Sequence, residues 1–264
     1  MADKIYDIAI IGGGISGLGV AWQASEQKKS VLLLEKGKIA SATSDNSLRI
    51  IHGGLRYLQQ MNIRRVMDSA KEQADLLDFA PNLIKPLWCV MPLSKFGLKS
   101  KIPMFFALIF YSILRVLAGA KFCKTGYIVS SNWIDKNIPI ISGEAKHGAF
   151  VWRDAIMPSD KKFSHYVADK SKELGAEIME DSKVESFSKL PNNNYQITFT
   201  NNGNTFTIEA KNLVDTAGAW FQDFNKKSIF PQIKWCKAFN VVISKKVLNE
   251  YVSTNEKGKK LVKE

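Results

Sequence analysis

The chain has 264 residues, 45% of them hydrophobic, which is enough for one large domain or two smaller ones with a sizeable core. The cysteines Cys89, Cys123 and Cys236 are odd in number and far apart, so the sequence predicts neither a metal site nor a disulfide framework and favours a reducing cytoplasm. The net charge of +12 is spread along the chain without a nucleic-acid-binding motif. A solvated basic surface is the simplest interpretation, and attraction of an anionic substrate or anionic lipid are the alternatives. The N-terminus leads almost directly into a strand, so we expect no signal peptide.

The first predicted elements carry a glycine pattern. Residues 8–11 form a short apolar strand that runs into Gly12, Gly14 and Gly17, in the spacing G-x-G-x-x-G, and apolar residues then recur at helical spacing. Gly12 permits a tight turn out of the strand, Gly14 lets the backbone approach a pyrophosphate, and Gly17 lets the helix pack close to the sheet. The helix N-terminus offers N–H groups and the positive end of its dipole to phosphates.

A second predicted strand, Val31–Leu34, ends on Glu35, whose carboxylate can accept hydrogen bonds from a ribose 2′-OH and would repel a 2′-phosphate. Because strand, glycines, helix, strand and acid follow in this order, the sequence predicts a bound dinucleotide; a glycine-rich turn without a ligand is the alternative. Residues 41–47 form a predicted loop of small hydroxyl and amide residues that can present polar groups to phosphate. The paired Gly53 and Gly54 imply a backbone close to something flat or bulky.

Two predicted helices follow. The first carries Ile63, Val66 and Ala70 on one face and ends before Pro81. The second, within residues 102–114, is apolar nearly all round and too short to span a bilayer, which needs about 20 residues. A buried helix of a cap domain is the preferred interpretation. The alternative is a helix in a membrane interface, with its basic neighbours at the headgroups: Lys99, Lys101, Arg115 and Lys121.

The remaining elements return to an alternation of strands and helices. Ser159 is a predicted helix N-cap, and Gly175 lies where the C-terminal glycine of that helix belongs. Residues 195–200 and 205–208 alternate around Asn-Asn-Gly, which predicts a hairpin. Further strands are predicted at residues 87–91, 149–152, 213–214 and 237–243.

Several of these pieces together resemble one family, the FAD-dependent glycerol-3-phosphate dehydrogenase group of the glycine- and D-amino-acid-oxidase-like flavoproteins. The matching pieces are IIGGGISGLG at residues 10–19, VLLLE at 31–35, ATS at 42–44, IHGGLRYL at 51–58 and VDTAGAW at 214–220. The resemblance covers nearly the whole chain, and IHGGLRYL after an ATS-type loop is its most specific part.

The resemblance implies an α/β fold with a Rossmann-like FAD/NAD(P)-binding domain and an interleaved α+β substrate (cap) domain. The FAD-binding domain is expected at residues 1–86 and 149–225, and the substrate domain at residues 87–148 and 226–264. Members of the group continue beyond the position that matches Glu264. We therefore expect a fragment, a truncated gene product or one half of a split protein.

The resemblance also implies a set of site residues. The expected FAD contacts are Gly12, Gly14, Ile15, Ser16, Gly17, Glu35, Lys36, Thr43, Ser44, Ser47, Leu48, His52, Gly53, Gly54, Val184, Ala217, Gly218 and Trp220. Arg56, with Arg49 near it in sequence, is expected to bind the anionic group of the substrate, because a guanidinium binds phosphate with two parallel hydrogen bonds; a surface ion pair is the alternative. His52 is the candidate catalytic base, since an imidazole titrates near neutral pH, and Arg56 is counted with it as catalytic; a structural histidine is the alternative.

The implied reaction is oxidation of sn-glycerol 3-phosphate to dihydroxyacetone phosphate by hydride transfer to FAD, with a quinone or another acceptor taking the electrons. Residues 153–166 read RDAIMPSDKKFSHY and lack the acidic pair that the group usually has there. An amine or amino-acid oxidase of the same superfamily is therefore one alternative, and a non-catalytic FAD-binding fragment or subunit is another. The expected location is the cytoplasm, with peripheral contact at the inner face of the membrane as its variant.

Overall fold

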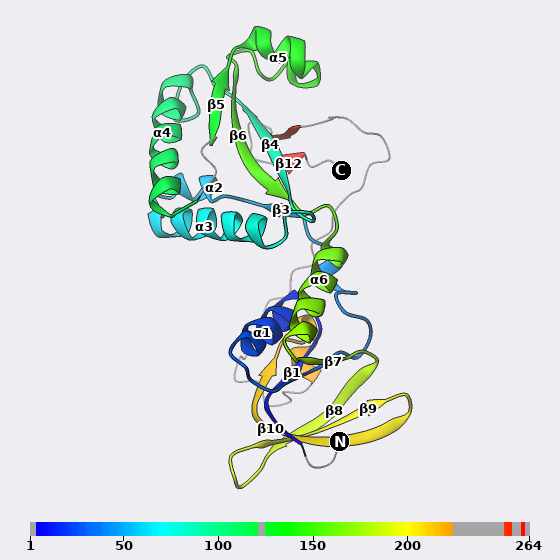
Figure 1. Ribbon diagram of the computed structural model, residues 1–264. Helices are drawn as coiled ribbons and strands as arrows, with labels where there is room; N and C mark the ends of the chain where they lie inside the picture. The colour runs from blue at the N-terminus through cyan, green and yellow to red at the C-terminus, as the bar shows by residue number, and fades with distance from the viewer. Residues whose placement is uncertain (1–3, 121–124, 224–250, 255–259, 262–264) are drawn as a thin grey trace. The chain divides into compact units, whose positions relative to one another are not determined.

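Figure 1 shows the computed structural model of the chain, which describes residues 4–120, 125–223, 251–254 and 260–261. The chain forms two units. Unit 1 contains Met1–Ser47 and Ser159–Phe239, and unit 2 contains Leu48–Pro158 and Asn240–Glu264. Each unit is built around its own sheet.

The sheet of unit 1 has the strand order β7-β2-β1-β10-β9-β8. Its strands are β1 (Ile5–Ile11), β2 (Val31–Leu34), β7 (Glu177–Met179), β8 (Ser182–Lys189), β9 (Tyr195–Asn201) and β10 (Asn204–Asp215). Strand β1 pairs in parallel with β2 and β10, and β2 pairs in parallel with β7. The carboxyl ends of these strands therefore meet at one edge of the sheet. Strand β2 is entirely buried, as is typical of a parallel strand that is covered on both faces.

The α-helices in the described part of unit 1 are α1 (Ile15–Glu26) and α6 (Asp160–Glu173), and they contact each other. The Ser159 hydroxyl accepts a hydrogen bond from the Lys162 N–H at 3.2 Å, which confirms the predicted N-cap of α6. Gly175 has a φ of +96°, which confirms the glycine predicted at the end of this helix.

The hairpin predicted around Asn-Asn-Gly is confirmed. Asn201 pairs with Asn204, and between them Asn202 and Gly203 have φ values of +50° and +78°. The strands predicted separately at residues 205–208 and 213–214 are one strand, β10. It is continuous because its first half pairs with β9 and its second half pairs with β1.

The sheet of unit 2 is mostly antiparallel, with the order β12-β11-β4-β6-β3 and with β5 also paired to β6. Its strands are β3 (Ile50–Ile51), β4 (Lys85–Pro92), β5 (Gly126–Val129), β6 (Ala149–Ile156), β11 (Tyr251–Thr254) and β12 (Lys260–Leu261). Its helices are α2 (Leu55–Leu58), α3 (Ile63–Phe79), α4 (Lys101–Leu117) and α5 (Ser131–Asn137). The parallel strands β10, β1, β2 and β7 in the mixed sheet of unit 1, together with an α+β unit 2, confirm the predicted fold class. The strand predicted at residues 237–243 lies outside the described residues.

The two units divide the chain at other positions than the predicted domains. The predicted FAD-binding domain includes residues 48–86 and 149–158, whereas both segments lie in unit 2. They do so because β3 and β4 pair with β6, and because α3 packs against α4. The IHGGLRYL stretch is therefore part of unit 2.

Helix α4 differs from the buried helix that we preferred. Among the described residues it packs against α2, α3 and β5 on the side where Met104, Tyr111, Leu114 and Arg115 are buried. The other side exposes a row of large apolar residues: Ile102, Phe105, Phe106, Ile109, Phe110, Ile113, Val116 and Leu117. Within the described ranges, no helix combines the length and the hydropathy needed to cross a membrane.

Candidate functional site

The glycine turn after β1 leaves no room for side chains. Gly12 has a φ of +102°, and a Cβ added there would lie 2.7 Å from the Thr216 carbonyl oxygen. A Cβ on Gly17 would collide with the Gly12 carbonyl oxygen and lie 2.7 Å from Thr216 Oγ1. The Thr216 hydroxyl lies 2.8 Å from the carbonyl oxygen of Ile11 and 2.9 Å from that of Gly12, so it secures the turn from β10. These contacts confirm the predicted reasons for Gly12 and Gly17, and they add Thr216, which the sequence reasoning missed.

The N-terminus of α1 is open at Gly14, its N-cap residue. A Cβ added to Gly14 would meet only Ser44 Oγ, at 3.2 Å. The same hydroxyl oxygen accepts a hydrogen bond from the Ile15 N–H at 2.9 Å, so the structure brings Gly14, Ile15 and Ser44 together. The first turn of α1 contains no acidic residue that would neutralise the positive end of the helix dipole. This end of the helix therefore favours an anion.

Glu35 lies at the carboxyl end of β2 and ties two loops together. Its Oε2 accepts a hydrogen bond from the Gly13 N–H at 2.7 Å, and its Oε1 accepts one from the Gly37 N–H at 2.8 Å. A Cβ on Gly13 would lie 2.9 Å from the Glu35 Cβ, so the glycine loop passes directly over this side chain. Each carboxylate oxygen keeps a further lone pair for a ribose hydroxyl.

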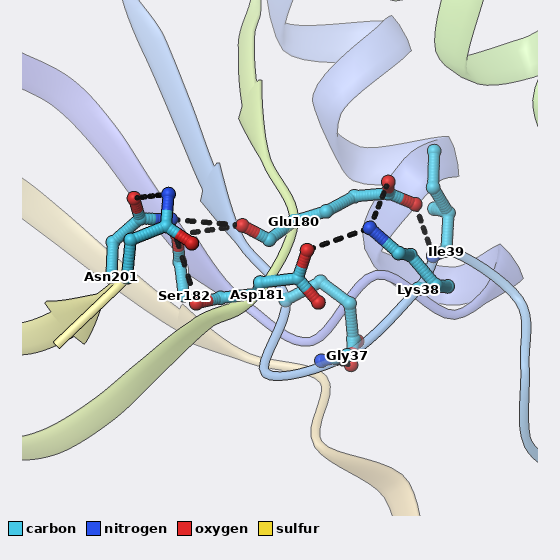
Figure 2. A network of polar contacts seen from close by, with 9 residues as sticks. Gly37, Lys38, Ile39, Glu180, Asp181, Ser182 and Asn201 are labelled. Carbon is cyan, nitrogen blue, oxygen red and sulfur yellow. Dashed lines mark hydrogen bonds and ion pairs between the residues drawn. The ribbon is translucent and has the colours of Figure 1, made fainter.

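The loop after Glu35 is held by the turn between β7 and β8, as Figure 2 shows. Glu180 Oε1 accepts a hydrogen bond from the Ile39 N–H at 2.8 Å, and Lys38 Nζ lies 2.6 Å from Asp181 Oδ2. The hydrogen bond to Asp181 raises the pKa of Lys38. Asn201, the last residue of β9, donates from Nδ2 to the Glu180 carbonyl at 3.0 Å and so also holds the turn. No motif in the sequence marks these contacts, because they join segments that lie far apart in the chain.

The turn after β10 lies against the glycine turn. A Cβ on Gly12 would be 3.0 Å from the Ala217 backbone nitrogen. The 3-10 helix Gly218–Asp223 follows, and its Trp220 ring lies 4.3 Å from Lys36 Nζ in a cation–π contact. Lys36, Ala217, Gly218 and Trp220, which come from opposite ends of unit 1, are thus brought to the same edge of the sheet.

The other predicted contacts of unit 1 are more scattered. The Ser47 hydroxyl donates to Asp160 Oδ2 at 2.9 Å, which links the ATS-type loop to the buried first residue of α6. Thr43 and Ser16 are exposed. The Val184 side chain is buried in the core of unit 1, so only its backbone is left for the role predicted there.

The predicted residues of unit 2 surround the loop between β3 and α2. His52 is half-buried, and its ring packs edge-on against Tyr57 with centroids 5.4 Å apart. Arg49 Nη1 donates to the Pro158 carbonyl at 3.2 Å. Arg56 is exposed on α2, and among the described residues it has no ion pair, so the alternative of a surface ion pair finds no support there. Leu48, at the start of unit 2, is exposed.

Comparisons with known proteins place the chain in a family. A family model described as FAD dependent oxidoreductase matches residues 7–259. The aerobic glycerol-3-phosphate dehydrogenase of Staphylococcus epidermidis is 29% identical over 92% of this chain and 44% of its own length. The enzyme of that name from Staphylococcus aureus is 33% identical over 83% of this chain and 39% of its own length.

Among solved structures, the glycerol-3-phosphate dehydrogenase from Bacillus halodurans complexed with FAD is similar, with a TM-score of 0.62 and 22% identity. The match covers 86% of this chain and 37% of that one. The chain thus spans less than half the length of the curated relatives that it matches. Because the family model covers most of the sequence, the chain belongs to the FAD-dependent oxidoreductase family, whose cofactor is FAD.

Proposed function

We propose that this chain supplies the FAD-binding and substrate-binding residues of a glycerol-3-phosphate dehydrogenase, which oxidises sn-glycerol 3-phosphate to dihydroxyacetone phosphate. The names of the relatives support this substrate, and family membership supports the chemistry. The observation that carries the proposal furthest is the glycine turn, where contact with Thr216 excludes a side chain at Gly12 and Gly17 while Gly14 stays open beside the N-terminus of α1.

The residues at this edge of unit 1 fit the ADP half of FAD. Gly14 and Ser16 would present N–H groups to the pyrophosphate. Ser44, whose oxygen accepts the Ile15 N–H, would donate its hydroxyl proton to the same group and so bring Ile15 to the cofactor. Glu35 would accept hydrogen bonds from the ribose. When bound, FAD supplies the hydride acceptor for the carbinol carbon of the substrate. The further proposed contacts remain those from the sequence: Gly12, Gly17, Lys36, Thr43, Ser47, Leu48, His52, Gly53, Gly54, Val184, Ala217, Gly218 and Trp220.

The proposed substrate residues belong to unit 2. Arg56 would bind the phosphate group with two parallel hydrogen bonds. Its side chain is exposed, and it forms no ion pair with any described residue that would compete for the guanidinium. Arg49 would add a second positive charge. His52 would accept the hydroxyl proton of the substrate through Nε2, because its Nδ1 is buried.

The test is to purify the chain with FAD and to follow the visible flavin absorbance after addition of glycerol 3-phosphate. Bleaching that depends on glycerol 3-phosphate is the expected result. Bound flavin that is reduced by an amine or amino acid instead, with release of peroxide, would establish the oxidase alternative. A chain that folds and binds no FAD would establish the alternative of a non-catalytic fragment or subunit.

We also propose that the exposed face of α4 contacts an anionic lipid surface, where a quinone acceptor would be available. The face consists of phenylalanine and aliphatic side chains, and the preceding loop exposes Phe96 and Leu98 by 78% and 86%. Lys95, Lys99 and Lys101 flank these apolar residues, as expected of a helix that lies in a membrane interface. Charge complementarity therefore favours lipid over a neutral apolar partner.

Cosedimentation with phosphatidylglycerol vesicles tests this contact. Phe106→Glu should weaken binding about tenfold or more, because it removes an aromatic ring that would be buried in the lipid and adds a negative charge. Ile140→Glu is the matched control, since Ile140 is also an exposed apolar residue of unit 2 but lies outside α4. The proposal would be contradicted if wild type and both variants sedimented equally with phosphatidylglycerol vesicles. It would also be contradicted if wild type bound phosphatidylcholine vesicles as well as phosphatidylglycerol vesicles.

A further inference from the structure

The backbone of Gly53, in the loop that carries His52, is held by side chains at both ends. Its N–H donates to Asp154 Oδ1 at 2.9 Å, and its carbonyl accepts a hydrogen bond from the Tyr111 hydroxyl at 2.7 Å. Buried backbone groups must be paired, and most are paired within helices or sheets. Here β3 ends at Ile51 and α2 begins at Leu55, so the pairing at Gly53 comes from β6 and α4 instead.

On the carbonyl side, hydrogen bonds run from α4 to α3 and back to the same loop. Arg115 Nη1 lies 3.1 Å from the Tyr111 hydroxyl oxygen and 3.0 Å from Gln73 Oε1, and Gln73 Nε2 donates to the Ile51 carbonyl at 2.8 Å. The direction of each bond is fixed, because a carbonyl only accepts and a guanidinium only donates. Burial raises the pKa of Tyr111 to about 12, so its hydroxyl keeps the proton that it donates to Gly53.

The Gly53 N–H is held by the buried carboxylate of Asp154. Asp154 Oδ2 accepts a hydrogen bond from Trp152 Nε1 at 3.1 Å, while Oδ1 holds Gly53. Asp154 is 4% exposed and Arg115 is 3% exposed, so two charged side chains are buried around one glycine. Burying charges is costly unless they are hydrogen-bonded, and replacing them by hydrophobic residues is often neutral or stabilising, so burial of charge is weak evidence of a role in stability.

The same network lies close to Gly53. A Cβ added there would collide with Arg115 Nη1 and would lie 2.6 Å from the Tyr111 hydroxyl oxygen and 2.9 Å from Gln73 Oε1. The next residue, Gly54, has a φ of +90° and is packed against α3, where a Cβ would lie 2.9 Å from the Val66 carbonyl oxygen. The peptide that follows His52 is therefore hydrogen-bonded and closely packed by residues of unit 2.

We propose that Tyr111 and Asp154, supported by Arg115 and Gln73, are positioning residues that fix the backbone beside His52 and thereby set the place of its ring. This role rests on the proposed function of His52 as the base. None of these residues needs to touch the substrate, because each acts through the Gly53 peptide or through the chain of hydrogen bonds behind it.

The test compares Tyr111→Phe with Tyr6→Phe. Both substitutions remove one hydroxyl from a fully buried tyrosine, and the Tyr6 hydroxyl donates to Glu177 in unit 1, far along the chain from the loop. The first readout is the NMR signal of the His52 ring, which is one of three histidines and is assigned by loss of its signal in His52→Gln. Tyr111→Phe should shift the His52 ring signal, and Tyr6→Phe should leave it unchanged.

The second readout is flavin reduction by glycerol 3-phosphate. A misplaced base should lower the maximal rate about tenfold to a hundredfold with little change in KM. Asp154→Asn, which keeps an oxygen acceptor for the Gly53 N–H, should retain more of the rate than Asp154→Ala. If wild type is not reduced at all, the proposed function fails while the NMR comparison still decides the positioning role. An unshifted His52 signal in Tyr111→Phe would overturn the proposal. If Tyr111→Phe does not fold, an unshifted signal in both Asp154 variants would overturn it instead.

Discussion

The two glycine loops of this chain are held in different ways. The turn at Gly12 and Gly17 is fixed by backbone contacts and one hydroxyl from the adjacent strand, so its geometry follows from a parallel strand–helix–strand unit. The loop at Gly53 is fixed by long side chains from β6, α3 and α4. The first arrangement can be read from a short motif. The second arrangement depends on residues that only the tertiary fold brings together. Each of these residues lies outside IHGGLRYL and can be substituted without changing that motif.

The largest expected effect separates substrate binding, proposed for Arg56 after the Gly53 loop, from FAD binding, proposed for the turn at Gly12. Arg56→Ala should weaken binding of glycerol 3-phosphate by about 2–5 kcal/mol, because a bound anion loses its charged partner, and it should leave FAD binding unchanged. Substrate titration and FAD titration of the same preparation measure the two effects. Arg64→Ala is the control, since Arg64 is an exposed arginine of α3 whose nearest carboxylate oxygen, on Asp68, is 3.9 Å away. Parallel loss of both ligands in Arg56→Ala would indicate misfolding and refute the assignment.

The close packing of the turn at Gly12 and Gly17 can be tested by comparing two glycine substitutions in helix α1. Gly17→Ala should destabilise the chain by about 1–3 kcal/mol, because its Cβ meets backbone that cannot move aside. Gly19→Ala, two residues on, meets nothing within 4 Å and should stabilise α1 by up to about 1 kcal/mol through helix propensity. Urea unfolding of both variants measures the difference. Effects of the same sign would show that the close approach at Gly17 does not determine stability.

A smaller effect is expected at the second loop. Gly53→Ala should cost about 1 kcal/mol, less than Gly17→Ala, because its Cβ meets the ends of side chains that can shift. The cost should fall further in the Tyr111→Phe background, since the hydroxyl that crowds Gly53 is gone. A double-mutant cycle by urea unfolding gives the coupling. Strict additivity would mean that the Tyr111 hydroxyl does not confine this loop.

The smallest expected effect concerns β1, at the opposite end from the glycine turn. Asp7 accepts hydrogen bonds from Lys211 and Ser30, and these hold its pKa well below the ordinary value. A lowered pKa in the folded state stabilises the fold above the ordinary pKa of about 4, and this contribution is lost as the pH falls. The stability difference between wild type and Asp7→Asn should therefore shrink between pH 6 and pH 3, as measured by thermal unfolding at each pH. Asp169→Asn, at an exposed ion pair with Lys172, is the control and should show no such trend. A constant difference for Asp7→Asn would contradict this account.

Much of the fold and of the glycine turn at Gly12 and Gly17 could be predicted from the sequence. The spacing of apolar residues, the turn residues and the spacing of glycines are all local properties of the chain. The strand at Val31–Leu34, the N-cap at Ser159 and the turn around Gly203 were all local patterns of this kind. The unit boundaries were not, because β6 pairs with strands from three separate segments. The sequence left the exposed face of α4 as the second of two alternatives, since a helix that is apolar nearly all round does not indicate which side its described neighbours cover.

The bond from Thr216 to the glycine turn has a consequence for synthesis. Its hydroxyl reaches Ile11 across 205 positions of sequence, and β10 is the strand that completes the pairing of β1. The dinucleotide turn therefore cannot close on a nascent chain until almost the whole of unit 1 has left the ribosome. Contacts of such long sequence separation form slowly. During that interval the side of β1 that later pairs with β10 is an open apolar edge, even after β1 has paired with β2, and a chaperone would have to protect it.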